Sequence, residues 1–274
     1  MNAPEAPPII PAATILLCND RPEGIETFMV VRHHQIDFAS GALVFPGGKV
    51  TPEDGSPEIE ALCDGLDTVP EGHLSFMVGA IREAFEESGV LLARQGGSSE
   101  LIGREALEPL DVHRDPLAKG ELPLLTFLTE HNLRLALDTL RRYAHWITPT
   151  FMPKRFDTHF YIADAPEGQI AQHDGSESVD SVWITAKQLL KEADEGKWTV
   201  IFPTRCNIEM LAQHKTIDDF RIWAEGHGIT ECLPWIDQRD DGPYLCIPKD
   251  SGYPTTEEKA SPKMVAQPKS FPKE

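Results

Sequence analysis

The chain has 274 residues, enough for one large domain or two small ones, and 41% of them are hydrophobic, so it can bury a substantial core. It carries 25 Lys and Arg residues against 44 Asp and Glu residues, a net charge of -19, which argues against binding a nucleic-acid backbone or an anionic membrane surface. A small anionic substrate stays compatible with this charge, because bound divalent cations reverse the local sign.

The five cysteines are scattered without a CxxC pair, so the sequence predicts neither a zinc knuckle nor a disulfide framework. An odd number of cysteines fits a reducing compartment. The opening residues "MNAPEAPPIIPAATILL" lack the basic segment of a signal peptide, and no apolar stretch is long enough to span a membrane. We therefore expect a soluble, cytoplasmic protein, and the sequence leaves its oligomeric state open.

The first part of the chain predicts strands followed by one helix. Residues 1–11 are rich in Pro and Ala and are expected to be flexible. Short apolar runs predict strands at 12–19, 26–34 and 41–45. Residues 51–72, with Pro, Gly and acidic side chains, predict a long loop. From 74 to 94 apolar residues recur at helical spacing, which predicts a helix.

The later part alternates helical and strand patterns. Residues 96–148 are expected to form an added helical section, because 121–147 places Leu133, Leu137 and Leu140 on a common helical face. Beyond it the pattern predicts strands at 155–166 and 178–185, a helix at 186–195, and two late helices within 203–227. The Pro- and Lys-rich residues 251–274 predict a disordered tail.

The stretch "AIREAFEESGV", residues 80–90, places Glu83, Glu86 and Glu87 on one side of the predicted helix. Like charges at this spacing destabilise a helix by roughly 0.2–0.5 kcal/mol per pair. Either water screens them on a solvated helix face, or a cation lies among them. Because Mg²⁺ prefers oxygen ligands, a bound divalent cation would explain the cluster.

Taken together, "GGKVTPED" and "REAFEESGV" resemble the Nudix box, which reads Gly, five residues, Glu, seven residues, then Arg-Glu-aliphatic-any-Glu-Glu-any-Gly-aliphatic. Gly48 matches the first glycine, and the second half of the pattern is matched by Arg82, Glu83, Glu86, Glu87, Gly89 and Val90. There are two departures. Asp54 stands where the family has its first Glu, with Glu53 as the neighbouring alternative, and residues 55–81 form a long insertion where the family has seven residues.

The resemblance implies a Nudix-type α/β (α+β) fold, an α/β/α sandwich with a mixed sheet, over a single domain at 12–250. It also implies hydrolysis of a diphosphate linkage with Mg²⁺ or Mn²⁺. The residues that it implies for catalysis are Arg82, Glu83, Glu86 and Glu87, the three glutamates also binding metal. A later loop would add Glu177, with Asp174 as its rival, and the substrate would lie against Gly47, Gly48 and Arg32.

The wider layout is similar to the coenzyme A diphosphatase-like branch of the family. Members of that branch often carry Arg-x3-Gly-x3-Phe-Pro-Gly-Gly; here Gly41 and residues 45–48 match, but Asp37 stands at the arginine position. The similarity to this branch makes coenzyme A or an acyl derivative the expected substrate. The alternative is a non-catalytic nucleotide-ligand sensor. His33, His34 and His159 could approach substrate or be strand histidines accommodated by their neighbours. Arg141 and Arg142 could contact a nucleotide or end an exposed helix.

Overall fold

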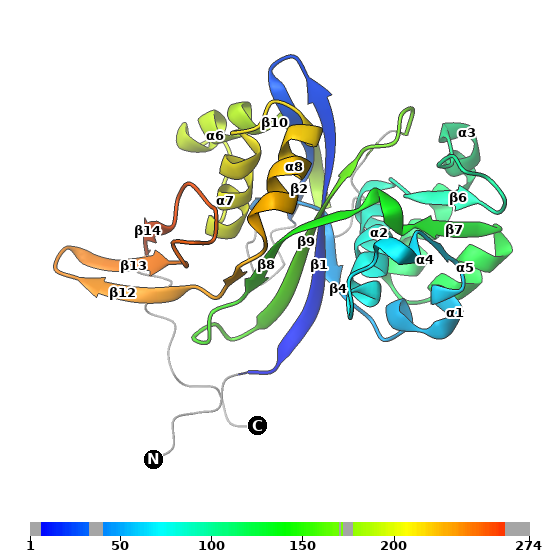
Figure 1. The fold of residues 1–274 in the computed structure, drawn as a ribbon, viewed down its shortest axis with the longest axis horizontal. Helices are drawn as coiled ribbons and strands as arrows, with labels where there is room; N and C mark the ends of the chain where they lie inside the picture. The colour runs from blue at the N-terminus through cyan, green and yellow to red at the C-terminus, as the bar shows by residue number, and fades with distance from the viewer. Residues whose placement is uncertain (1–6, 33–40, 170, 172–177, 261–274) are drawn as a thin grey trace.

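In the computed structural model, residues 7–32, 41–169, 171 and 178–260 are described. A central sheet separates two layers of helices, with α6, α7 and α8 on one face and α2 among smaller elements on the other (Figure 1). This arrangement confirms the expected α/β/α sandwich.

The central sheet is mixed, as expected. Its strand order is β10-β2-β1-β9-β8-β11, with β3 paired to β2 and β4 paired to β1. β1 runs parallel to β9, and β11 parallel to β8, whereas the other pairs are antiparallel. The bounds of the strands are β1 Ile9–Arg21, β2 Gly24–Arg32, β3 Leu43–Val44, β4 Gly47–Lys49, β8 Arg141–Ile147, β9 Arg155–Asp164, β10 Ser178–Thr185 and β11 Glu231–Cys232.

Strand β1 is covered on both faces. Ile15 and Leu17 belong to the core under α2, whereas Leu16 and Cys18 belong to the core on the opposite face. A strand buried on both sides reads as a continuous apolar run, which is why "ATILLC" was recognisable from sequence. It begins at Ile9, so the prediction that residues 1–11 are flexible is wrong for its last residues; residues 1–6 lie outside the described part.

Helix α2 (Leu74–Ser88) carries the glutamate cluster. Its buried side includes Met77, Ile81 and Phe85, which recur at helical spacing and pack against β1. Gly89 ends the helix with φ 72°, a left-handed conformation that glycine adopts readily, so the helix is shorter than the predicted 74–94.

The insertion before α2 contains short elements in place of the loop predicted at 51–72. These are a 3₁₀ helix at Glu53–Gly55, α1 (Pro57–Glu60), β5 (Cys63–Asp64) and a second 3₁₀ helix at Leu66–Thr68. β5 joins a small separate sheet of order β5-β7-β6, with β6 at Ala93–Gln95 and β7 at Leu133–Ala136. The insertion is therefore held by strand pairing with residues far along the chain.

The expected helical section at 96–148 is only partly helical. It contains α3 (Arg104–Leu107), a 3₁₀ helix at Glu108–His113, α4 (Arg114–Ala118) and α5 (Leu124–Glu130). The helix predicted over 121–147 is wrong beyond Glu130, because Asn132 takes a left-handed φ of 50° and the chain continues as β7 and β8. Pairing with β9 in the sheet outweighs the local helical pattern.

The opposite face is covered by α6 (Ala186–Asp194), α7 (Phe202–Leu211) and α8 (Ile217–His227). A third sheet follows, β12 (Trp235–Arg239), β13 (Gly242–Cys246) and β14 (Glu257–Lys259). The buried Tyr253 hydroxyl accepts a hydrogen bond from Trp146 Nε1 at 2.8 Å and donates one to Asn207 Oδ1 at 3.0 Å. The predicted disordered tail is therefore wrong for residues 251–260, and residues 261–274 lie outside the described part. Among the described helices, none has the length and apolar character that crossing a membrane requires.

Candidate active site

The polar side of α2 meets the glycine pair in β4. The backbone N–H of Gly47 donates to Glu87 Oε2 at 3.0 Å. A Cβ atom added to Gly48 would lie 2.6 Å from the Glu83 carboxyl group, and one added to Gly47 would lie 2.5 Å from the carbonyl oxygen of Ala13. Close backbone contact therefore requires glycine at position 47, whereas at position 48 a side chain would displace the Glu83 carboxyl group; Gly47–Lys49 forms the short strand β4.

Arg82 joins the glutamates to the strand beneath them. Its Nε and Nη2 donate to both oxygens of Asp54 at 2.9 and 3.0 Å, and Nη2 also donates to the Lys49 carbonyl at 2.7 Å. Its Nη1 donates to Glu83 Oε1 at 2.9 Å and to Glu86 Oε2 at 3.1 Å, so two glutamates share one nitrogen. Burial alone would lower the pKa of Arg82, but the surrounding carboxylates outweigh it and raise the pKa above its usual range.

The two acids left open by the sequence have separate positions. Asp54 is fully buried, and besides Arg82 it accepts the backbone N–H of Thr51 at 2.7 Å. Glu53 points elsewhere: it accepts the backbone N–H groups of Leu124 and Leu125 at the start of α5, at 3.3 and 3.1 Å. Asp54 is thus the acid that touches the box arginine, whereas Glu53 satisfies the free N–H groups of a helix end.

Glu86 is the most buried of the three glutamates. Burial, and next the neighbouring charge of Glu83, raise the pKa of Glu86 to about 7, against the opposing effect of Arg82. Its backbone carbonyl accepts Arg114 Nε–H at 3.1 Å, a contact that no sequence pattern had indicated. Burial disfavours the charged form of this carboxylate, and two further carboxylates lie next to it on the same helix turn. Together they form a set of oxygen ligands that fits a hard divalent cation.

Several residues expected at the site cannot be placed there. Glu177, Asp174, His33, His34 and Asp37 lie outside the described residues. Arg32 ends β2, where its backbone pairs with Ser178, but its side chain is not described.

His159, Arg141 and Arg142 lie on the sheet and not beside the glutamates. Ala13 of β1 pairs with Gly48 on one side and with His159 of β9 on the other. At about 5 Å per strand, His159 is roughly 10 Å from Gly48 along the sheet. Arg141 and Arg142 begin β8, so their expected place at an exposed helix end is wrong.

Comparison with known proteins agrees with this architecture. A family model described as the NUDT19 Nudix domain matches residues 63–208, more than half of the chain. The acyl-coenzyme A diphosphatase NUDT19 of Xenopus laevis is 22% identical over 271 residues, which cover 84% of this chain and 71% of that protein. The human protein of the same name is 25% identical over 275 residues, covering 84% and 73%. The crystal structure of a NUDIX hydrolase from Alicyclobacillus acidocaldarius matches the fold with a TM-score of 0.66 at 24% identity, over 80% of this chain and 96% of that one.

Proposed function

Because the chain belongs to the NUDT19 Nudix domain family, we propose that this Nudix diphosphatase cleaves the diphosphate linkage of coenzyme A or an acyl-coenzyme A, with Mg²⁺ or Mn²⁺ as cofactor. The substrate class is suggested by the names of its relatives in Xenopus laevis and Homo sapiens. The observation that supports the reaction most directly is the contact of Glu83 and Glu87 with the Gly47–Gly48 pair of β4.

The three glutamates of α2 are proposed to hold the metal, with Glu177 as a further ligand from a later loop. A bound divalent cation would neutralise the diphosphate and lower the pKa of a water molecule. A carboxylate of the cluster accepts the proton of the attacking water, whose oxygen bonds to one phosphorus while the bridging P–O bond breaks. Two phosphorylated halves leave the site.

The role proposed for Arg82 is to orient Glu83 and Glu86. Hydrogen bonds to Asp54 and to the Lys49 carbonyl hold the guanidinium group, so the N–H groups that reach the two glutamates have a fixed orientation. Bidentate pairing with a carboxylate fixes the plane of a guanidinium group. Gly47, Gly48 and Arg32 are proposed to line the substrate site, since the glycines lie against Glu83 and Glu87 and Arg32 ends β2, which pairs with β1 as β4 does.

The test is hydrolysis of a substrate panel by the purified chain with Mg²⁺ or Mn²⁺. The panel contains coenzyme A, an acyl-coenzyme A, NADH, ADP-ribose and a nucleoside triphosphate, and products are identified by mass. We expect coenzyme A and its acyl derivative to be cleaved fastest, and reaction in ¹⁸O-labelled water to label one of the two phosphorylated products. Turnover of ADP-ribose alone would contradict the proposed substrate, and binding without any turnover would indicate the sensor alternative.

Matched variants test the proposed residues. Glu87→Gln keeps an oxygen for the Gly47 N–H but loses the charge, and it should lower kcat by about a hundredfold or more. Glu60→Gln, in α1 and exposed, removes a charge of the same kind away from the cluster and should leave kcat unchanged. Equal activity of both variants would overturn the assignment of Glu87.

A further inference from the structure

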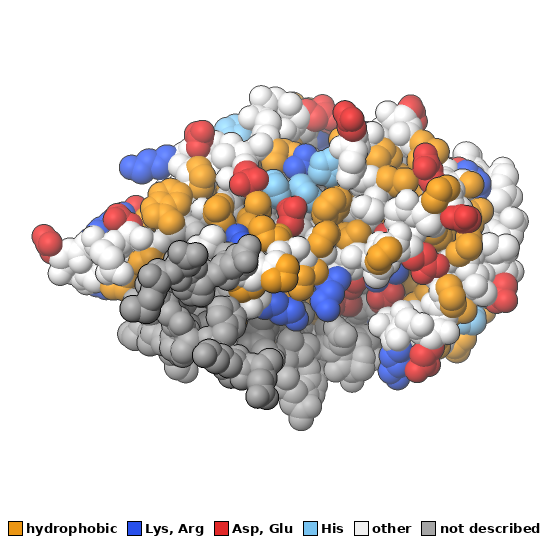
Figure 2. Space-filling model, turned by 90° about the horizontal axis from the view of Figure 1, so that it is seen from below, with side chains coloured by type: hydrophobic (Ala, Val, Ile, Leu, Met, Phe, Trp, Pro, Cys, Tyr) orange, Lys and Arg blue, Asp and Glu red, His pale blue; other side chains and the backbone are white. Residues whose placement is uncertain are grey.

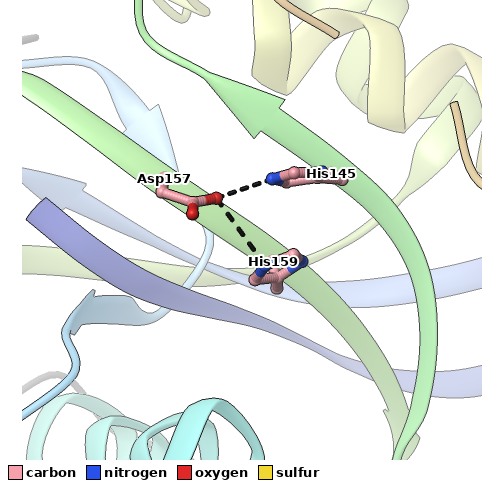
Figure 3. A group of neighbouring side chains, drawn as sticks. All are labelled: His145, Asp157 and His159. Carbon is pink, nitrogen blue, oxygen red and sulfur yellow. Dashed lines mark hydrogen bonds and ion pairs between the residues drawn. The ribbon is translucent and has the colours of Figure 1, made fainter. Parts of the chain in front are cut away.

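A second cluster of polar side chains lies on β8 and β9, on the face of the sheet that α2 covers. His145 Nε2 lies 2.6 Å from Asp157 Oδ1, and His159 Nε2 lies 3.6 Å from the same oxygen (Figure 3). The two imidazole rings are stacked with centroids 4.2 Å apart. His73, the residue before α2, has its ring 4.7 Å from that of His159. In Figure 2, histidine side chains gather in the middle of one face of the molecule.

Two histidines and one carboxylate are a donor set that transition metals favour, and their ligand atoms lie within 4.8 Å of one another. The hydrogen bond from Arg142 to His159 argues against a metal ion in this cluster. Arg142 Nε–H donates to His159 Nδ1 at 3.1 Å, so the neutral imidazole carries its proton on Nε2, the atom that would have to bind the ion. A metal-bound histidine normally donates from its second nitrogen, whereas here that nitrogen accepts.

Arg142 is the unusual member of this cluster. The part of the chain that the structure describes gives it no ion pair, whereas Arg82 and Arg94 each bind carboxylates. It is half-buried, and burial lowers its pKa. After burial, the charge of Arg142 is a leading cause of the lowered pKa of His73, and the charges of His145 and Arg142 lower that of His159. The acids facing the cluster are Asp157 and, 3.9 Å from His145 Nδ1, Glu231.

We propose that Arg142 forms a binding site for a phosphate-class anion, separate from the carboxylate cluster of α2. Among the described residues, the hydrogen bond to His159 engages only Nε of Arg142, which leaves the two terminal nitrogens, a pair of donors that suits a phosphate group, for a ligand. Asp157 contacts His145 and His159, and its charge reaches Arg142 only from a distance, where it partly offsets the effect of burial on the pKa of the guanidinium group. Arg142 is the binding residue, and His159 positions it.

The site lies near the proposed active site but does not open directly onto it. His159 is about two strand spacings, roughly 10 Å, from Gly48, and the buried Ala13 under α2 lies between them. The anion could therefore be a second phosphate carried by an extended substrate, or free phosphate acting from a separate position. Both sources present the same chemistry to Arg142.

Binding is tested with inorganic phosphate and the full chain in EDTA, so that no divalent ion can hold phosphate at α2. We expect phosphate to raise the melting temperature of the protein, and the ³¹P resonance of phosphate to broaden on binding. Arg142→Gln should weaken phosphate binding about tenfold or more. Arg142→Lys, which keeps the charge, should retain part of the effect and shows that loss is not due to misfolding. Arg141→Gln, the neighbouring arginine whose Nε lies 3.9 Å from Glu225 Oε1, is the matched control and should bind like the unchanged chain.

Equal phosphate binding by Arg142→Gln and the unchanged chain would overturn the proposal. So would Co²⁺ absorption bands of a tetrahedral site that disappear in His145→Asn, because they would assign the cluster to a metal. These readouts need no turnover, so they fail or succeed independently of the proposed hydrolysis.

Kinetics then distinguish the two sources. If the phosphate belongs to the substrate, Arg142→Gln raises KM for coenzyme A and leaves KM for 3′-dephospho-coenzyme A and kcat for both unchanged. If phosphate acts as a free ligand, the variant changes neither KM and loses only the effect of added phosphate on rate or stability. Either result supports the site.

Discussion

Asp54 decides where the guanidinium group of Arg82 lies. It is fully buried and binds both Nε and Nη2, so its charge is compensated by a single partner that in turn holds two glutamates. Asp54→Asn should destabilise the fold by about 3 kcal/mol, because it leaves Arg82 without its main counter-ion. Urea unfolding measures the loss, and kcat should fall as Glu83 and Glu86 are released.

The neighbouring acid provides the control for this prediction. Glu53→Gln weakens the bonds to the first N–H groups of α5 and should cost only about 1 kcal/mol, with kcat retained. If Glu53→Gln lowered kcat as much as Asp54→Asn, the assignment of Asp54 as the acid that supports the active site would be contradicted.

Gly48 is a second residue whose replacement should affect chemistry more than stability. Alanine there would place a methyl group 2.6 Å from the Glu83 carboxyl, which can move away because it ends a flexible side chain. We expect Gly48→Ala to keep its melting temperature within a few degrees and to lose on the order of a hundredfold in kcat/KM. Gly103→Ala, where a Cβ atom meets nothing within 4 Å, should change neither quantity.

Helix α2 is the element in which binding and stability meet. Its three carboxylates should make the protein more stable with Mg²⁺, by on the order of 5 °C in melting temperature at saturation, and EDTA should reverse the gain. Differential scanning fluorimetry measures it. Glu87→Gln should reduce the shift while Glu60→Gln keeps it; an undiminished shift in Glu87→Gln would mean that the ion binds elsewhere.

The elements differ in how far the sequence alone predicts them. Helix α2 begins where expected because apolar residues at three- and four-residue spacing agree with its burial. β7 was missed, although Leu133 and Leu135 are buried and alternate with other residues, which is a strand signal. Helical and strand periods overlap in a leucine-rich run, and only pairing with β5 and β6 selects the strand.

The same limit applies to the candidate site. The box motif identified Arg82 and the glutamates because their spacing is local to one helix. The choice of Asp54 over Glu53 depends on α5, some seventy residues away, and the contact of Arg114 with Glu86 depends on how the section at 96–148 folds. The local sequence pattern cannot predict either feature, because both depend on contacts between residues far apart in the chain.

At the scale of the whole molecule, burial should make the protein inert toward thiol reagents. All five cysteines are free and buried, and burial raises the pKa of Cys18, Cys63 and Cys232 to about 12. Because the thiolate is the reactive form, Ellman's reagent at pH 8 should titrate no thiol within minutes in the native protein and five after denaturation. A rapidly reacting native thiol would contradict this arrangement.

The hydrogen bonds of Tyr253 set a limit on how far the chain can be shortened. Cutting it after residue 250 would strip the indole N–H of Trp146 of its acceptor deep inside the protein, a loss of about 1–3 kcal/mol, and would also remove β14 from the edge of β13. A fragment designed to end where the sequence pattern fades should therefore melt earlier than one that continues through Ala260, although both contain every proposed catalytic residue.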